Sequence, residues 1–133
     1  MRRLLYMQIG IGLLAAVIFQ VGLEQRLAGL IAGTGFVFVG LYGARVGWTW
    51  RHHGAFSIAV LVLALIHLFG VALPMLGFRI LSWDEPFSKV AVWGLSGPEF
   101  HKLSTRFYGI WMFVTGLASW MDRRISRKAA AGK

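Results

Sequence analysis

The chain has 133 residues, of which 57% are hydrophobic and 14% are charged, and its formal net charge is +9. This composition argues against a water-soluble domain, because a folded chain of this length would have too few polar side chains to cover its surface. There is no cysteine, which excludes disulfides, thiolate metal sites and thiol catalysis.

Four apolar stretches, each long enough to cross a bilayer, organise the sequence. A helix of about 20 residues spans a hydrocarbon core of roughly 30 Å, and the stretches lack the alternation in polarity of a membrane barrel. We therefore predict an all-α integral membrane protein, with residues 1–133 forming one compact bundle of four transmembrane helices. The predicted spans are residues 4–23, 27–46, 54–77 and 98–122, and residues 79–97 form the loop between the last two.

The first span contains no charged side chain. Arg2 and Arg3 precede it as in a signal peptide, but its apolar run exceeds an h-region of about 7 to 15 residues, so we expect a retained helix. The small multidrug transporters resemble this chain in length and number of spans only. They depend on an acidic residue in the first helix, where this chain has only Gln8 and Gln20 as polar residues.

The second span is rich in small residues, many of them four positions apart on one side of the helix. This helix-packing face consists of Gly29, Gly33, Gly40, Ala44 and Gly47. Small residues at this spacing let two helix backbones approach closely. The face serves equally well for contacts within the chain or for an oligomer interface, and we favour the first.

The third span carries two notable residues, His67 and Pro74. Proline removes a backbone donor and clashes with the residue four positions earlier, here Gly70, so we expect a bend or a helix end at this point. His67 is the one ionisable side chain of this span. Because an ionisable group inside a membrane is a functional hypothesis by default, we treat it as a candidate site residue.

The loop of residues 79–97 mixes charged and aromatic side chains. Asp84 is placed to cap a short helix from Glu85 to about Trp93, with Pro86 in its first turn. Tryptophan favours the headgroup level, so we expect this helix to lie along the outer membrane surface as an interfacial connector. A lid over an external cavity is the alternative.

The fourth span has a recognisable start. Ser96 and Glu99 have the spacing of a capping box and Pro98 falls in the first turn, so the helix should begin near Gly97. Polar residues recur along it at intervals of three and four, which places them on one stripe that must face protein or water. The stripe consists of His101, Thr105, Tyr108, Met112, Thr115 and Ser119.

A candidate polar cluster within the membrane follows from these two helices. Its members are His67, His101, Thr105, Arg106 and Tyr108. If His67 turns toward the stripe, the cluster can hold a small polar head such as a quinone carbonyl, although hydrogen bonding between helices explains the same residues. Arg106 is placed to snorkel to headgroups or to pair with an acid. His67 and His101 lie at different depths, by roughly 10–15 Å, so one chain is poorly arranged to clamp a haem.

Arginine and lysine set the expected orientation. They are dense at the amino terminus, in the loop after the second span and in the tail, and these segments should be cytoplasmic. Both termini then lie inside, and loops one and three outside. Trp48, Trp50 and Trp120 are the expected inner interfacial anchors, with Trp83 and Trp93 opposite.

The sequence contains no catalytic constellation and no metal-ligand spacing, so we expect neither an enzyme nor a metal site. We predict a small protein of the bacterial inner membrane that acts as an accessory subunit through contacts with other membrane subunits or its own copies. It should have no cofactor and no nucleic-acid partner, since the basic residues beside the spans suit topology and the lipid bilayer. The alternatives are a quinone- or haem-associated anchor of a redox complex and a small oligomeric channel or transporter.

Overall fold

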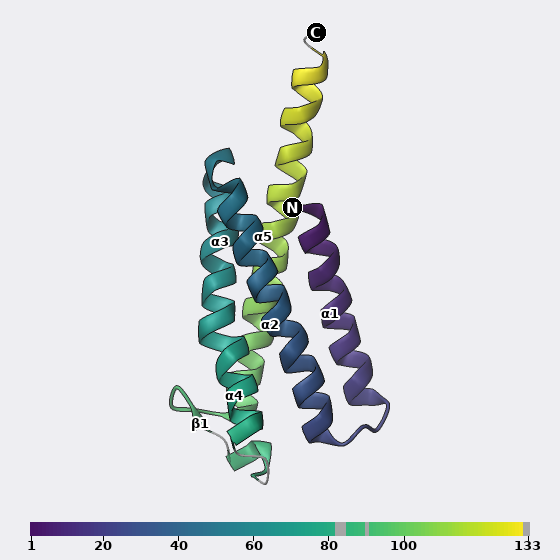
Figure 1. The fold of residues 1–133 in the computed structure, drawn as a ribbon, viewed down its shortest axis with the longest axis vertical. Coiled ribbons are helices and arrows are strands. Elements are labelled where there is room, and N and C mark those ends of the chain that lie inside the picture. Colours follow the sequence, from purple (N-terminus) through teal and green to yellow (C-terminus); the bar gives the residue numbers. More distant parts are fainter. Residues whose placement is uncertain (82–84, 90, 132–133) are drawn as a thin grey trace.

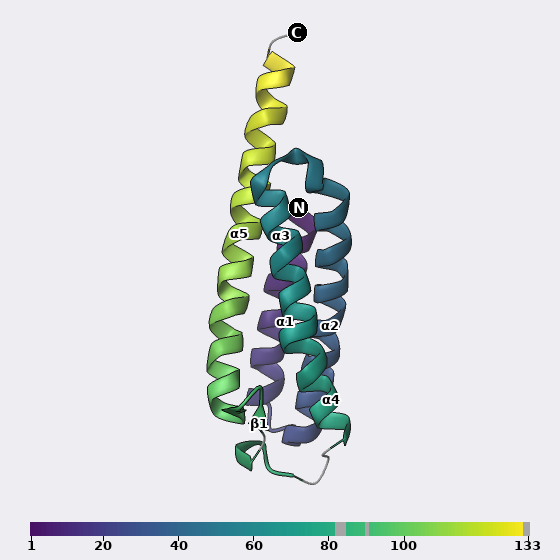
Figure 2. The same ribbon diagram turned by 90° about the vertical axis from the view of Figure 1, so that its left-hand side faces the viewer.

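The computed structural model describes residues 1–81, 85–89 and 91–131, and it shows four long helical rods (Figures 1 and 2). The first two rods are α1 (Arg2–Gln20) and α2 (Gln25–Trp50). The short 3₁₀ helix η1 (Arg51–His53) leads into the third rod, which combines α3 (Ala55–Ile66), η2 (His67–Ala72) and α4 (Leu73–Leu81). The fourth is α5 (Gly97–Ala131). The all-α prediction is therefore confirmed at the level of fold class.

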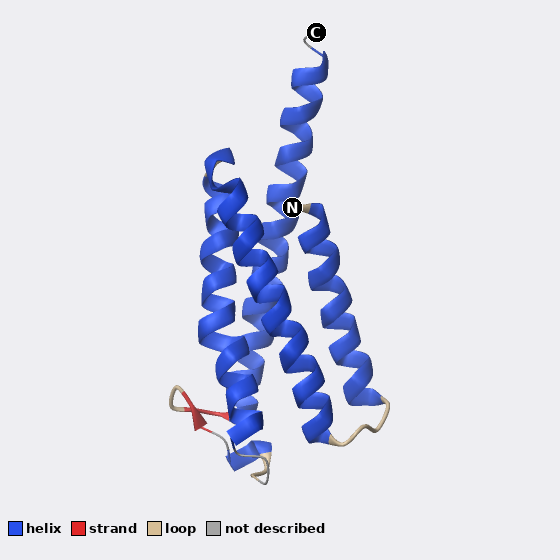
Figure 3. Ribbon diagram, in the orientation of Figure 1, coloured by secondary structure: helices blue, strands red, loops and turns tan. Residues whose placement is uncertain are grey.

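The rods run up and down, so the bundle has two distinct ends. Met1 and η1 lie at one end, which we call the terminal end, and α5 projects beyond them (Figure 1). The α1–α2 connection and the strands β1 (Ala91–Val92) and β2 (Leu95–Ser96) lie at the other, which we call the hairpin end (Figures 1 and 3). The third and fourth rods thus meet at the hairpin end through a connection that is not helical throughout.

Three helical stretches are long and apolar enough to cross a membrane: Arg2–Gln20, Gln25–His53 and Ala55–Leu81. Large apolar side chains cover their outward faces, among them Leu13, Phe38 and Phe69. Among the described residues, α5 does not reach the same hydropathy. The polar stripe and Arg106 account for its lower hydropathy.

The third rod changes its helical form at His67. Residues His67–Ala72 adopt a π-helix, which continues directly into α4. Pro74 has no N–H to offer the Gly70 carbonyl four residues earlier, and Trp93 Nε1 donates a hydrogen bond to that carbonyl at 3.2 Å. The helix does not end at Pro74: a π segment precedes the proline, and α4 continues through it to Leu81.

The predicted interfacial helix of residues 85–93 is wrong. Phe87–Lys89 form a single 3₁₀ turn, η3, and β1 then pairs with β2 in an antiparallel hairpin. Trp93 and Gly94 make its two-residue turn with φ of 55° and 78°, the positive values that a type I′ turn requires. This turn chemistry prevails over the helix-start signal at Pro86. The predicted cap Asp84 and the anchor Trp83 lie outside the described residues.

The start of α5 agrees with the prediction. The helix begins at Gly97, and Glu99 Oε2 accepts hydrogen bonds from the Ser96 backbone N–H at 3.0 Å and from the Ser96 hydroxyl at 2.5 Å. A small apolar cluster, in which Val92 and Phe100 are buried against Met75 and Phe87, fastens the hairpin to this helix start.

The small residues of α2 bring it close to the third rod. A side chain at Gly47 would meet the Leu61 backbone at 2.6 Å, and one at Gly40 would meet Leu68 at 3.2 Å. At Gly43 it would collide with the ring of Trp111, which is fully buried. Contacts this short are possible only without a Cβ, so these glycines fix the spacing of the helices.

Candidate functional site

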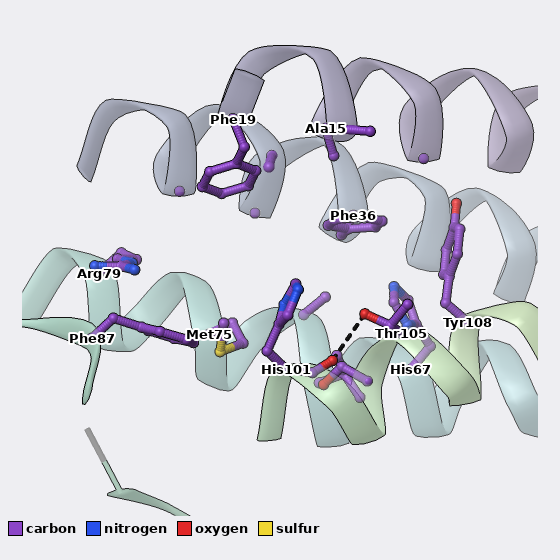
Figure 4. A pocket seen from close by; sticks show the side chains of 18 of the residues that line it. Ala15, Phe19, Phe36, His67, Met75, Arg79, Phe87, His101, Thr105 and Tyr108 are labelled. Carbon is purple, nitrogen blue, oxygen red and sulfur yellow. Dashed lines mark hydrogen bonds between the residues drawn. The ribbon is translucent and has the colours of Figure 1, made fainter. Parts of the chain in front are cut away.

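The hairpin half of the bundle contains a partly open cavity of about 550 Å³. Its walls come from α1, α2, η2, α4, η3 and α5, so all four rods contribute. The lining is mainly apolar. In Figure 4, Arg79 and Phe87 lie toward one end and His67 and Tyr108 toward the other, with Met75, His101 and Thr105 between them. We call the end at His67 the deep end and the end at Arg79 the shallow end.

Small side chains on α1 and α2 create this space. Ala15 and Ala16 of α1 and Ala32 and Gly33 of α2 all line the cavity. Nearer the terminal end, α1 contacts α5 directly, because the Tyr108 hydroxyl donates a 2.8 Å hydrogen bond to the Gln8 carbonyl. The contact between α1 and α5 therefore closes one half of the bundle, while small residues leave the other half open.

Aromatic rings surround His67 at the deep end. Its ring centroid lies 4.9 Å from that of Trp111, 5.3 Å from that of Tyr108 and 5.9 Å from that of Phe36. The histidine is the first residue of the π segment, and π segments occur frequently at functional sites. The imidazole is thus held between α2 and α5 by ring packing.

The imidazole of His67 is buried without a hydrogen-bond partner. The side chain is 2% exposed, and neither ring nitrogen makes a hydrogen bond of ordinary geometry to any described residue. The backbone of Phe36 lies close enough to His67 for a weak hydrogen bond that falls outside ordinary geometry. Leaving a buried polar group unmatched costs about 1–3 kcal/mol. A group in this state beside a cavity points to a partner that enters the cavity.

Three more buried side chains share this condition in the described part of the chain. The amide of Gln8, the indole N–H of Trp111 and the Ser119 hydroxyl have no hydrogen-bond partner there. Of the four, only His67 lines the cavity. His67 is therefore the one of the four that borders the cavity, and its two ring nitrogens are covered by neighbouring atoms.

The shallow end carries a cation. Arg79 is half-buried, its guanidinium carbon lies 5.0 Å from the centroid of the Phe87 ring, and its aliphatic stem fills the space beside Gly29. Arg26 lies nearby, and its Nε is 4.0 Å from Glu24 Oε1, so that its charge is paired with a carboxylate. Among the described residues no carboxylate forms a salt bridge with Arg79. Arg79 thus places a positive charge at this end of the cavity.

Four of the five predicted cluster residues meet in this cavity. His67, His101, Thr105 and Tyr108 all line it, and the Thr105 hydroxyl donates to the His101 carbonyl at 2.9 Å. Arg106 does not belong to the group: it is exposed and lies outside the lining. Further along the predicted stripe, Thr115 and Ser119 are buried in the bundle.

The other predicted positions divide between the two ends. Gly29 and Gly33 line the cavity, while Gly40, Ala44 and Gly47 pack inside the chain. Trp48, Trp50 and Trp120 lie toward the terminal end. Two of them make cation–π contacts there: the guanidinium carbon of Arg51 lies 4.2 Å from the ring centroid of Trp48, and that of Arg124 lies 3.9 Å from the ring centroid of Trp120. Trp93 lies at the hairpin end with 74% of its surface exposed.

Three residues of the site were not predicted from the sequence: Arg79, Phe36 and Trp111. Trp111 had a signal, because it lies three residues after Tyr108 on the same helix and therefore near the polar stripe. Arg79 lies at the end of an apolar run, where a snorkelling arginine is ordinary. Phe36 is one of many apolar residues in α2, and its place beside His67 depends on how two rods pack.

The cavity supplies hydrogen-bonding and charged groups but no metal cluster. No set of three or more His, Cys, Asp or Glu side chains gathers within the described ranges. His101 lies seven residues from Tyr108, which packs on His67, so the two histidines differ in depth by about 10 Å. No family model, curated protein or solved structure matches the chain.

Proposed function

We propose that the protein is a binding protein of the bacterial inner membrane that holds a lipid-soluble molecule in its cavity. In this proposal α5 is a fourth span, both termini are cytoplasmic, and the cavity occupies the outer half of the membrane. The even number of rods and the arginines of the terminal end support this orientation. The polar stripe lowers the hydropathy of α5, but much of it faces the cavity or the core instead of lipid.

One observation carries the proposal: His67 is 2% exposed, has no hydrogen-bond partner among the described residues and lines a cavity of about 550 Å³. Ligand sites of roughly 300–1,000 Å³ commonly combine an apolar lining with a few fixed polar groups. A ligand carbonyl or hydroxyl next to His67 would supply the missing hydrogen bond. Membrane quinones, which pair carbonyls with an apolar body, belong to this class, and a quinone-associated redox anchor is its functional setting.

The role of the residues is binding and not bond chemistry. His67 gives or accepts one hydrogen bond, depending on its tautomer. Tyr108 is held by Gln8 and so keeps the aromatic wall in place. Phe36 and Trp111 present ring faces that exclude water from the contact.

Quinone binding by the full chain in lipid nanodiscs tests this function. Decylubiquinone, a neutral short-chain quinone, should quench tryptophan fluorescence saturably, because Trp111 packs directly on His67. His67→Phe keeps the ring packing and should weaken binding about tenfold, which is the value of one hydrogen bond of roughly 1.4 kcal/mol. His52→Phe at the terminal end is the matched control. Equal affinity in all three proteins would refute the role of His67.

A second candidate, an accessory subunit, is favoured by the length of α5. At 35 residues the helix measures about 52 Å at the ordinary rise, well beyond a hydrocarbon core of roughly 30 Å. Figure 1 shows it extending past the rest of the bundle at the terminal end. Such a basic helical extension suits contacts with another subunit. The mass of the tagged protein extracted from its own membrane in mild detergent tests this: a particle no larger than the chain or its homo-oligomer rejects it.

A further inference from the structure

We infer that the ligand is an elongated amphiphile with an acidic group at one end, which Arg79 binds, and an uncharged hydrogen-bonding group at the other, which His67 binds. This rests on the proposed function and adds the charge and length of the ligand. Figure 4 shows the two residues at opposite ends of the cavity. They stand twelve residues apart on the continuous third rod, or about 18 Å at helical rise.

The cation at the shallow end is the first part of the reasoning. Arg79 is half-buried and lacks a salt bridge to any described carboxylate, whereas the neighbouring Arg26 is paired with Glu24. Guanidinium groups bind carboxylates and phosphates through paired, charge-assisted hydrogen bonds. An anionic group on the ligand would give Arg79 the counter-ion that no described carboxylate supplies. A neutral quinone would leave Arg79 without one.

The shape of the guanidinium site is the second part. The stem of Arg79 fits against Gly29, where any side chain would displace it: a Cβ there would lie 2.9 Å from Arg79 Nε. Phe87 packs against the guanidinium from η3. Contacts on two sides hold the guanidinium beside the cavity, although a free arginine at a membrane boundary would extend away toward headgroups.

The apolar middle of the cavity is the third part. Between the two polar ends the lining includes Ala15, Ala32, Val71, Ala72 and Met75. A volume of about 550 Å³ falls in the range for a ligand of drug size, which corresponds to one alkyl chain and not to a two-chain phospholipid. The cavity therefore suits a single chain with a polar group at each end.

Four probes of equal chain length separate the two ends: hexadecanoate, 16-hydroxyhexadecanoate, 1-hexadecanol and 1,16-hexadecanediol. Binding to the full chain in zwitterionic nanodiscs is measured by tryptophan fluorescence. The acids should bind about tenfold more tightly than the matching alcohols, the value of one charge-assisted contact. Arg79→Gln should abolish this preference, whereas Lys102→Gln, an exposed lysine at the same end and outside the lining, should keep it. The additional hydroxyl of 16-hydroxyhexadecanoate and of 1,16-hexadecanediol should tighten binding only in proteins that retain His67.

The outcomes distinguish the two proposals. A hydroxyl preference that His67→Phe removes, without any acid preference, upholds the cavity as a binding site and overturns the inference about Arg79. An acid preference that Arg79→Gln removes, without any dependence on His67, supports the anionic end and overturns the role of His67. Equal binding of all four probes by every variant overturns both.

A further arm identifies the source of the acid. Nanodiscs containing phosphatidylglycerol offer a lipid phosphate to the same arginine. If they remove the acid preference in the wild-type chain, membrane lipid supplies the anionic group at Arg79. If the preference persists, a free single-chain acid is the ligand. Unchanged unfolding temperatures of Arg79→Gln and Lys102→Gln establish that both variants are folded.

Discussion

The terminal and hairpin halves of the bundle use the same small residues to opposite effect. In the terminal half, Gly43 and Gly47 of α2 are covered by Trp111 and by the Leu61 backbone, so no space is left beside these two glycines. In the hairpin half, Ala15 of α1 and Ala32 of α2 face a cavity of about 550 Å³. Small residues bring helices together only where a neighbour fills the space that they leave. Where none does, they leave a cavity.

Replacing a glycine by alanine should lower the stability of the protein most in the terminal half. A Cβ at Gly47 would lie 2.6 Å from Leu61 Cα and 2.8 Å from its backbone nitrogen, so Gly47→Ala forces two helices apart. Overpacking of this kind costs about 1–3 kcal/mol. We expect a clear drop in the thermal unfolding midpoint, measured by circular dichroism in detergent. Gly116→Ala is the control, because nothing lies within 4 Å of its Cβ position; equal midpoints for the two variants would disprove the close contact.

That close packing was predictable from the sequence, and the cavity was not. The spacing of Gly40, Ala44 and Gly47 marks a packing face whatever the partner helix is. Likewise, Ser96 and Glu99 fix the start of α5 through local hydrogen bonds. A cavity depends on what stands opposite each small residue, and that is a property of the assembled bundle.

Some residues of the candidate site could be predicted from the sequence, and others could not. His101, Thr105 and Tyr108 share one helix face by spacing alone, so their common location follows from the sequence. Arg106 is one residue from that face and turns away from it. Arg79 is held in the site by contacts with Gly29 of α2 and with Phe87 of η3. A surface helix was expected where η3 lies, so the position of Phe87 on the guanidinium could not be predicted.

Filling the cavity should separate stability from binding. Ala15→Leu places a larger side chain in open space, so the unfolding midpoint should hardly change while decylubiquinone binding weakens by about tenfold or more, roughly 1.4 kcal/mol. Ala64→Leu makes the same change in the packed core of the terminal half, where Ala64 is fully buried, and should lower the midpoint instead. If Ala15→Leu destabilises the chain as strongly as Ala64→Leu does, the hairpin half is packed as tightly as the other.

The hydrogen bonding of His67 and Tyr108 at the deep end predicts opposite effects of two substitutions on stability. His67 has no hydrogen-bond partner among the described residues, so His67→Phe should leave the free energy of unfolding unchanged or raise it by up to about 1 kcal/mol. Tyr108 has a partner, the Gln8 carbonyl at 2.8 Å, and Tyr108→Phe should lower it by about 0.5–1.5 kcal/mol. Unfolding of both variants in detergent measures the difference. A marked loss on His67→Phe would mean that the imidazole is satisfied within the protein.

The smallest expected effect concerns how the hairpin is held to the third rod. Trp93 Nε1 donates to the Gly70 carbonyl, which Pro74 cannot serve because it has no N–H. The contact is solvent-exposed, so Trp93→Phe should cost only about 0.5–1 kcal/mol. The change should appear as faster hydrogen exchange at Val92 and Leu95, the hydrogen-bonded pair of the hairpin, with the rest of the bundle unchanged.

Pro74→Ala provides the matching variant, because it restores a backbone donor four residues from Gly70. If Trp93 takes the place of that donor, Trp93→Phe should accelerate exchange in the hairpin less in the Pro74→Ala background than in the wild type. Additive effects of the two changes would show that the carbonyl is not shared between them. Coupled effects would mean that the hairpin half is held by single hydrogen bonds where the terminal half is held by close packing. The hairpin half can then contain a cavity while the close helix contacts of the terminal half stay intact.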